Sequence, residues 1–186
     1  MAPKSGRATA KLERTPRQSE GPYYPLTKAA DAGWDLLDTG ADPGGVPLQL
    51  SGRVVDTSGR PLAGALVEIW QADNQGIYDH PHAPNYKNFD KAFRGYGEVQ
   101  TGNDGIYRFR TIVPVRYTGR PPHIHVKVKS EDHETLTTQL YIKGHPDNRR
   151  DFLLARIFSG SRQRLMMDIK PASTGPGKTT TYDFVI

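Results

Sequence analysis

A run near the middle of the chain, from Tyr117 to Val128, gathers residue types that bind metals and stabilise negative charge. From His123 onward polar and apolar residues alternate, and this period-two pattern is typical of a β-strand. His123 and His125 therefore share one face, with Cβ atoms roughly 6 to 7 Å apart. Two imidazoles at that spacing can bind a single metal ion, although an isolated His-x-His is equally expected on a solvent-facing polar strand.

Two prolines stiffen the entry to this strand. Pro121 and Pro122 fix the backbone φ angle and remove two hydrogen-bond donors. We therefore expect Arg120 and Tyr117 to be held on a rigid approach to the histidines rather than on a mobile loop. The run thus combines a phenol, a guanidinium and two imidazoles within a short stretch of chain.

The elements that position this run are expected to be short β-strands between turns. The sequence has 19 glycines and 15 prolines, with β-branched runs between them, which favours an all-β domain. We predict a β-sandwich of two mainly antiparallel sheets with long loops and little helix. The expected strands are 50–55, 65–70, 106–112, 123–128, 136–142 and 179–186, with a long connection at 71–97 and one short helix at 149–157.

Length and composition exclude several classes of protein. A chain of 186 residues can bury a core as one domain without covalent staples. It has no cysteine, so disulfides, thiolate metal sites and a cysteine nucleophile are excluded together. There is no apolar span of about 18 residues and no apolar stretch at the amino terminus, so we predict neither membrane insertion nor a secretory signal. We expect a cytoplasmic protein.

The net charge of +5 is unevenly distributed. Residues 1–19 carry five basic side chains and one acidic one, whereas the remainder carries 20 basic and 19 acidic side chains. A near-neutral body lacks the basic face of nucleic-acid binders, so we expect no nucleic-acid partner. We predict that residues 1–19 form a basic, flexible or subunit-wrapping arm. Residues 20–186 are then a single domain.

Several motifs occur in an order that is typical of one enzyme family. They are Val67-Glu-Ile-Trp-Gln-Ala-Asp73, Gly76-Ile-Tyr78, Tyr107-Arg-Phe-Arg-Thr-Ile112, Tyr117 and Arg120-Pro-Pro-His-Ile-His125. In this order they resemble the intradiol ring-cleavage dioxygenases, a group that includes catechol 1,2-dioxygenases and protocatechuate 3,4-dioxygenases. The resemblance runs from Glu20 to Gly144 and is specific because separate motifs agree.

The resemblance implies a mononuclear, non-haem Fe(III) cofactor held by two tyrosinates and two histidines. Tyr78 and Tyr117 match the tyrosine positions, and His123 and His125 match the histidine positions. These residue types suit the metal, because a phenol with a pKa near 10 loses its proton to a hard trivalent cation. Two histidines and one carboxylate would instead suit a ferrous oxygenase.

The resemblance also implies a reaction between a small catecholic substrate and O2. Both oxygen atoms enter the ring, which opens between the two hydroxylated carbons to a muconate-type dicarboxylic acid. Tyr117 matches a tyrosine that leaves the metal and takes up a substrate proton. Arg120 matches an arginine that stabilises the developing negative charge, and Gln139 matches a polar residue that supports the site. We also expect a homo-oligomer.

Two features depart from the named enzymes. Tyr117 and His123 are only six positions apart, so we expect a lower wall over the pocket and a more open site. No helical segment like the dimerisation region of catechol 1,2-dioxygenases precedes the sandwich, so we expect an architecture closer to protocatechuate 3,4-dioxygenase subunits. The ring substituents of the substrate stay open, and the basic arm and open pocket are compatible with an anionic one.

Other side chains have more ordinary interpretations. His80 and His82 form a second His-x-His, but Pro81 and the loop around them favour a position at the pocket rim or on the surface. Arg120 could simply pair with a carboxylate. Three aromatic residues either line the substrate cavity or belong to the core: Tyr23, Tyr24 and Trp70.

Two rival functions remain open at this point. The first is a non-catalytic β-sandwich module of the transthyretin or carboxypeptidase-regulatory kind, because the hairpin sequences 52–65 and 104–109 are shared with such modules. Such a module has no need for the tyrosine, arginine and histidines of the central run. The second is a cupin-type metalloenzyme, which should add a downstream carboxylate and histidine on strands, a requirement that His133 and His145 fit poorly.

Overall fold

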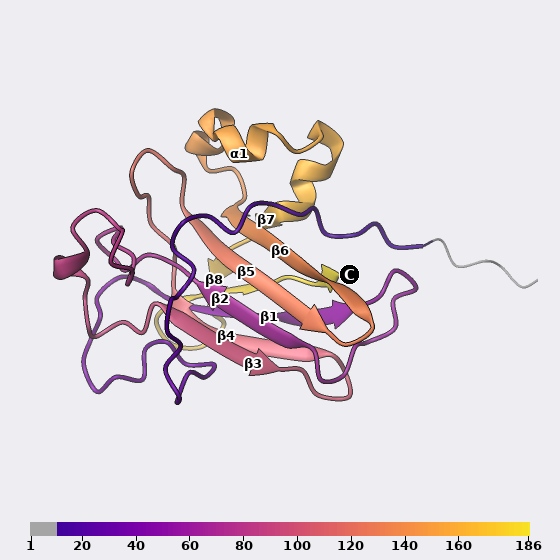
Figure 1. Cartoon of the computed structure of the whole chain (residues 1–186), viewed down its shortest axis with the longest axis horizontal. Helices are drawn as coiled ribbons and strands as arrows, with labels where there is room; N and C mark the ends of the chain where they lie inside the picture. Colours follow the sequence, from indigo (N-terminus) through magenta and orange to yellow (C-terminus); the bar gives the residue numbers. More distant parts are fainter. Residues whose placement is uncertain (1–10) are drawn as a thin grey trace, which may run out of the picture.

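The computed structural model describes residues 11–186, which form two β-sheets packed face to face (Figure 1). The first sheet has the order β10-β1-β9-β8, and β4 also pairs with β1. Its strands are β1 (Pro47–Val55), β4 (Ile106–Ile112), β8 (Lys170–Pro171), β9 (Lys178–Thr181) and β10 (Phe184–Val185). The second sheet has the order β3-β2-β5-β6-β7. Its strands are β2 (Leu66–Trp70), β3 (Tyr96–Gln100), β5 (His123–Ser130), β6 (His133–Ile142) and β7 (Met166–Met167).

The long ladders of both sheets are antiparallel. They join β1 to β4, β2 to β3 and β5, and β5 to β6, whereas the shorter pairs β1–β9, β1–β10 and β6–β7 are parallel. This confirms the predicted sandwich of two mainly antiparallel sheets. Strand β3 begins within the expected connection 71–97, because Gly97 weakens its strand signal. A Cβ at Gly97 would lie 2.6 Å from the carbonyl oxygen of Gly33, so the close approach of these segments requires glycine.

The core lies between the sheets because alternate residues of the central strands are apolar and point inward. The buried inward residues of the two layers include Leu48, Leu50 and Phe109 on the first sheet and Val67, Ile69, Ile124, Val126 and Val128 on the second. Burying one such side chain contributes about 1.5 to 3 kcal/mol. The other face of β2 and β5 is also buried, and it carries His123 and His125.

A helical excursion lies between β6 and β7, at the top of Figure 1. It contains three short pieces, η2 (Pro146–Arg150), α1 (Phe152–Ala155) and η3 (Ser159–Leu165). The single helix expected at 149–157 is therefore interrupted. The cause is Asp151, whose backbone is extended (φ −75°, ψ 118°) and whose side chain accepts a hydrogen bond from the Leu154 N–H across 2.7 Å. That is the conformation of a helix N-cap, so one helix ends before Asp151 and another begins after it.

The long connection between β2 and β3 is ordered by one buried carboxylate. Asp73 is inaccessible to solvent, and its Oδ1 accepts a hydrogen bond from the Ile77 N–H across 2.9 Å. Its Oδ2 accepts another from the Asp90 N–H across 2.8 Å. The connection, which includes η1 (Tyr86–Asn88), is thus fixed at both ends to a single side chain.

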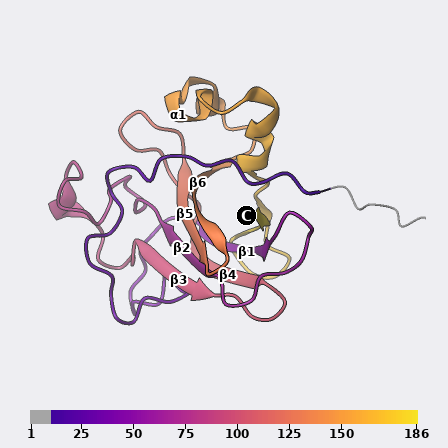
Figure 2. The ribbon, with the colours of Figure 1, turned by 45° about the vertical axis from the view of Figure 1, so that its right-hand side comes forward.

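The N-terminal segment runs in an extended conformation across β6 and the start of β5, as the indigo trace in Figure 1 and Figure 2 shows. The Thr15 N–H donates to the Val185 carbonyl and the Gln18 N–H to the Thr137 carbonyl, both across 2.9 Å. Residues 1–10 of the predicted flexible arm lie outside the described residues, and residues 11–19 lie against the sandwich. The division at residue 20 stays a prediction.

In residues 11–186 no helix combines the length and the apolarity that a membrane span needs.

Candidate active site

The register of the second sheet aligns polar side chains on its outer face. Residues directly opposite in an antiparallel pair share a face, and His125 lies between Trp70 on β2 and Gln139 on β6. In the next row on that face, His123 is opposite Tyr141. The two histidines thus point the same way, as their alternation with apolar residues predicts. Their face is buried, however, because the N-terminal segment and the loop after β2 cover it.

The two imidazoles are oriented as a ligand pair. His123 and His125 are 2% and 1% exposed, and their Nε2 atoms lie 3.2 Å apart. The carbonyl of Pro121 can only accept, so His123 Nδ1 must carry the proton that it donates to this oxygen across 2.7 Å. The lone pair of His123 is therefore on Nε2. Trp70 stacks on the second ring, with centroids 4.9 Å apart and planes at 12°, and so fixes the orientation of His125.

Tyr78 and Tyr117 complete a closed set with these histidines, here called the four-ring cluster (Tyr78, Tyr117, His123 and His125). The centroids of the two phenol rings are 4.9 Å apart, and those of Tyr117 and His123 are 5.4 Å apart. The two imidazole centroids are separated by 4.8 Å, and those of His125 and Tyr78 by 5.9 Å. The four rings thus come from three places: the loop between β2 and β3, the segment between β4 and β5, and β5 itself.

A glycine allows the loop to bring Tyr78 to this position. Gly76 has a φ of +79°, and a Cβ there would lie 2.5 Å from the carbonyl oxygen of Arg116. Only glycine tolerates both the left-handed backbone and this close approach. The loop can therefore pass directly beside the segment that carries Tyr117.

Burial controls the protonation of all four side chains. It lowers the pKa of His123 to about 4, with the nearby Arg120 charge acting in the same direction. Burial, then the neighbouring imidazole and then Arg120, lower the pKa of His125 well below 6.5. Both rings are neutral at pH 7, which is the form that binds metals. Burial also raises the pKa of Tyr78 and, against the opposing effect of Arg120, that of Tyr117.

The four-ring cluster fits a hard, highly charged ion. Within residues 11–186, no group of three or more His, Cys, Asp or Glu side chains is arranged to hold a metal. An ion bound by His123 and His125 would therefore draw its anionic ligands from the phenols. A phenol whose pKa is raised by burial gives up its proton only to a strong Lewis acid, so the donor set suits trivalent iron better than a soft or weakly charged ion.

Arg120 is fixed beside this cluster by a network of hydrogen bonds. Its Nε donates to Asp151 Oδ2 across 2.5 Å, and its Nη2 donates to Gln139 Oε1 across 2.9 Å and to the Tyr141 hydroxyl across 3.2 Å. The carboxylate pairing considered as an alternative for Arg120 is therefore present. These contacts do not use Nη1. The Phe152 ring lies 5.5 Å from the guanidinium carbon, which is within the range of a cation–π contact.

The chain is similar in sequence to known dioxygenases. A family model described as "Dioxygenase" matches residues 19–186. Catechol 1,2-dioxygenase from Acinetobacter baylyi is 34% identical over an alignment of 172 residues that covers 83% of this chain and 53% of that protein.

The chain belongs to the intradiol ring-cleavage dioxygenase family.

Two other similar proteins match over a larger share of their own length. The protocatechuate 3,4-dioxygenase beta chain from Burkholderia cepacia is 32% identical over 178 residues, covering 88% of this chain and 76% of that one. The solved dioxygenase domain of a dioxygenase carbohydrate-binding protein fusion from Streptomyces sp. SirexAA-E is 38% identical, with a TM-score of 0.72 over 94% of this chain and 98% of that one. The chain spans only about half the length of the Acinetobacter enzyme.

Sequence reasoning missed two members of the arginine network. Tyr141 follows from the sheet register, since it alternates with Gln139 and lies opposite His123. Asp151 is harder to predict from the sequence. An aspartate before Phe-Leu-Leu-Ala indicates a helix N-cap, but it does not indicate a contact with Arg120. His82 is exposed as expected, but His80 is buried, with its ring centroid 5.6 Å from that of Tyr23.

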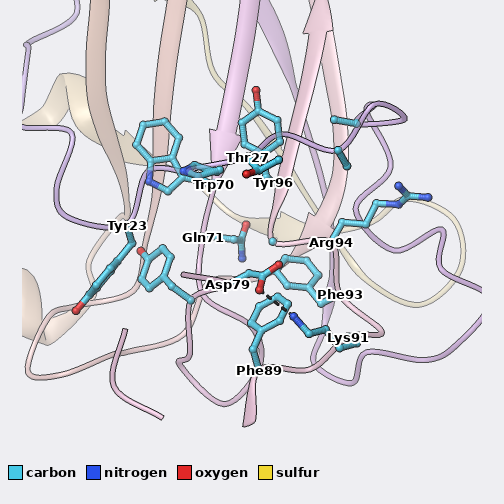
Figure 3. Close-up of a pocket in the computed structure, with 15 residues that line it drawn as sticks. Tyr23, Thr27, Trp70, Gln71, Asp79, Phe89, Lys91, Phe93, Arg94 and Tyr96 are labelled. Carbon is cyan, nitrogen blue, oxygen red and sulfur yellow. Dashed lines mark hydrogen bonds and ion pairs between the residues drawn. The ribbon is translucent and has the colours of Figure 1, made fainter. Parts of the chain in front are cut away.

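A cavity of about 250 Å³, drawn in Figure 3, has one lining residue in common with the four-ring cluster. Tyr78 lines it, but the other three cluster residues do not. Besides Tyr78, five aromatic residues line it: Tyr23, Trp70, Phe89, Phe93 and Tyr96. At its edge Lys91 donates to Asp79 across 2.9 Å, drawn as a dashed line in Figure 3. Tyr23 and Trp70 therefore line a cavity, one of the two positions expected for them.

Proposed function

We propose that this protein is an intradiol dioxygenase that opens a catecholic ring between its two hydroxylated carbons. Both atoms of O2 would enter the product, a muconate-type dicarboxylic acid. The observation that supports the proposal is the four-ring cluster, in which neighbouring rings have centroids 4.8 to 5.9 Å apart, beside an arginine held by Asp151. Relatives with 30% identity or more include enzymes named for catechol and protocatechuate, which supports a catecholic substrate.

The cofactor in this proposal is one non-haem ferric ion held by the four-ring cluster. Tyr78 and Tyr117 would bind it as phenolates, and His123 and His125 through Nε2. When bound, ferric iron supplies the Lewis acid and electron acceptor that make a catecholate reactive toward O2. Two phenolates and two neutral imidazoles favour the ferric over the ferrous state, because the anionic donors compensate the higher charge.

Tyr117 is the cluster member suited to take a proton from the catechol. It is the only one of the four that is partly exposed, since Tyr78, His123 and His125 are each at most 3% exposed. It opens a tight turn in which the Arg120 N–H donates to its carbonyl across 2.7 Å. Its phenolate can accept the proton of an incoming hydroxyl within hydrogen-bond reach, which is the geometry of a general base.

Arg120 would stabilise the negative charge that develops on the ring. Its guanidinium is buried and held by Asp151 and Gln139, so it needs no reorganisation when charge develops. Gln139 would act through this contact, because its Oε1 is bonded to Arg120 and its Nε2 donates to the Ser19 carbonyl across 3.0 Å. The amide is thereby oriented from both ends.

A non-catalytic module is the weaker alternative. In such a module the two imidazoles could share at most one hydrogen bond between their Nε2 atoms, which lie 3.2 Å apart, while the buried His125 Nδ1 has no partner among the described residues. The remaining parts of the proposal come from the sequence: O2 as co-substrate, a homo-oligomeric assembly, no nucleic-acid partner and a cytoplasmic location.

The test is a labelling experiment on purified, iron-loaded protein. We expect a wine-red tyrosinate-to-iron absorption band that changes when catechols are added, and ring-opened dicarboxylic acids that carry two ¹⁸O atoms after reaction under ¹⁸O2. A panel with carboxylate, sulfonate, hydroxyl and alkyl substituents would identify the preferred ring. A colourless protein that cannot be reconstituted with iron, or a product with a semialdehyde group from cleavage outside the diol, would contradict the proposal.

A further inference from the structure

Asp151 lies outside the four-ring cluster, yet both of its carboxylate oxygens are committed to contacts near it. Its side chain is inaccessible to solvent. Oδ2 accepts the bond from Arg120 Nε across 2.5 Å. Oδ1 accepts from the Leu154 N–H across 2.7 Å and lies 3.4 Å from the Tyr141 hydroxyl. One buried carboxylate therefore joins the start of α1 to the arginine beside the candidate site.

These contacts determine where the guanidinium points. The group is planar, so fixing two of its nitrogens also fixes the third. Asp151 holds Nε, and Gln139 and Tyr141 hold Nη2. Nη1 is left to face other groups, with Phe152 over the guanidinium. Of these partners only Asp151 carries a formal negative charge, so it also compensates the positive charge of an arginine that is 7% exposed.

We propose that Asp151 is a positioning residue that holds the Arg120 guanidinium in the orientation that ring opening requires. The inference rests on the proposed function and deepens it. Asp151 acts through Arg120 and does not touch the substrate. A displacement of about 1 Å at a reacting centre can cost about a hundredfold in rate, so loss of this contact should affect turnover more than substrate binding.

The experiment is a double-mutant cycle on the iron-loaded enzyme, with kcat and KM expressed per bound iron. Asp151→Asn keeps the size of the side chain and the oxygen that caps α1, but it removes the charge opposite Arg120. We expect it to lower kcat by about tenfold to a hundredfold and to change KM by less than about threefold. Combined with Arg120→Lys, it should lower kcat no further than Arg120→Lys alone, because residues that act as a unit are not additive.

A second ion pair, between the same excursion and the segment before β5, provides the matched control. Asp147 Oδ2 lies 2.8 Å from Arg116 Nε, so the same two atom types are paired, but the arginine side chain is 67% exposed. Asp147→Asn should leave kcat and KM unchanged. A kcat for Asp151→Asn within about twofold of wild type, or losses that multiply in the double variant, would overturn the proposal.

An exchange measurement covers the case in which Asp151→Asn fails to fold. In the iron-free full chain, NMR can follow solvent exchange of arginine Nε–H groups, and Arg120→Lys identifies the signal of interest. We expect the Arg120 Nε–H to exchange at least about tenfold more slowly than that of Arg116, because its partner is buried. Equal exchange rates would overturn the positioning role. A wild-type enzyme that opens no catechol ring would instead remove the proposed function, while the exchange comparison still decides whether Asp151 fixes Arg120.

Discussion

The chain contains two His-x-His motifs, and only one has the geometry of a metal-ligand pair. The rings of His123 and His125 have centroids 4.8 Å apart with planes at 70°, and those of His80 and His82 have nearly the same values, 5.2 Å and 71°. The difference lies in the nitrogens. On β5 two Nε2 atoms face each other at 3.2 Å, whereas in the loop His80 Nδ1 accepts a hydrogen bond from the His82 N–H.

Surroundings explain the different outcome. On β5 the Pro121 carbonyl binds one imidazole and Trp70 stacks on the other, so both rings are held with Nε2 turned to a common point. The loop pair has Pro81 between its members and no neighbouring strand to align them, and His82 is exposed. Spacing in sequence, and even spacing between rings, is therefore insufficient evidence for a metal site. The direction of the donor atoms and their burial are what distinguish the two motifs.

The strongest way to sharpen this comparison is to remove one ligand of the β5 pair. His125→Ala should lose iron, the red colour and turnover together, with turnover falling by more than about a hundredfold. Mutating a residue that only supports a metal ligand already lowers metal affinity or activity by about tenfold to a hundredfold. Iron content by mass spectrometry and catechol consumption measure both effects. Full activity in this variant would remove His125 from the coordination sphere.

Tyr117→Phe separates metal binding from proton transfer. Three members of the four-ring cluster remain, so we expect much of the iron to be retained with a shifted absorption band. Turnover should fall by about a hundredfold or more, the range for loss of a general base. Stopped-flow absorbance during catechol binding, together with iron analysis, measures this separation. Unchanged turnover with normal iron would assign the proton transfer to another group.

The pH dependence of stability tests the burial of the β5 pair. The pKa of His123 is lowered from 6.5 to about 4 in the folded protein, so the unfolded chain binds more protons between these values. The contribution of His123 to the free energy of unfolding is therefore complete above pH 6.5. It is lost as the pH falls toward 4, by up to about 3 kcal/mol. Urea unfolding of the iron-free protein at pH 7 and pH 4 measures the loss, and His123→Asn should reduce it. An equal loss in that variant would contradict the assignment.

The smallest effect is expected in the loop motif. His82→Ala removes an exposed side chain, so the free energy of unfolding should change by less than about 0.5 kcal/mol. Iron content and turnover should match wild type. Loss of iron from this variant would mean that the loop motif contributes to a metal site after all.

The structure corrects the sequence-based expectations where residues far apart meet. Alternation of polar and apolar residues on the strand that carries His123 indicates one buried and one exposed face, but the N-terminal segment and the loop after β2 cover its outer face as well. The helix expected at 149–157 is interrupted at Asp151, because the backbone of this residue is extended. Its side chain caps the helix that follows and accepts a hydrogen bond from Arg120. Nothing in the local sequence of Asp151 indicates that partner, which is 31 positions away.

By itself the sequence determined the strand character of β5 and the common face of His123 and His125, because side-chain alternation follows from the sterics of a few adjacent residues. It also contained the motifs that predict the family. Only the tertiary structure decided that Tyr78 reaches these histidines, that their face is buried, and that Asp151 holds Arg120. Such contacts depend on loop closure and packing between distant segments, which alternation within one strand does not encode.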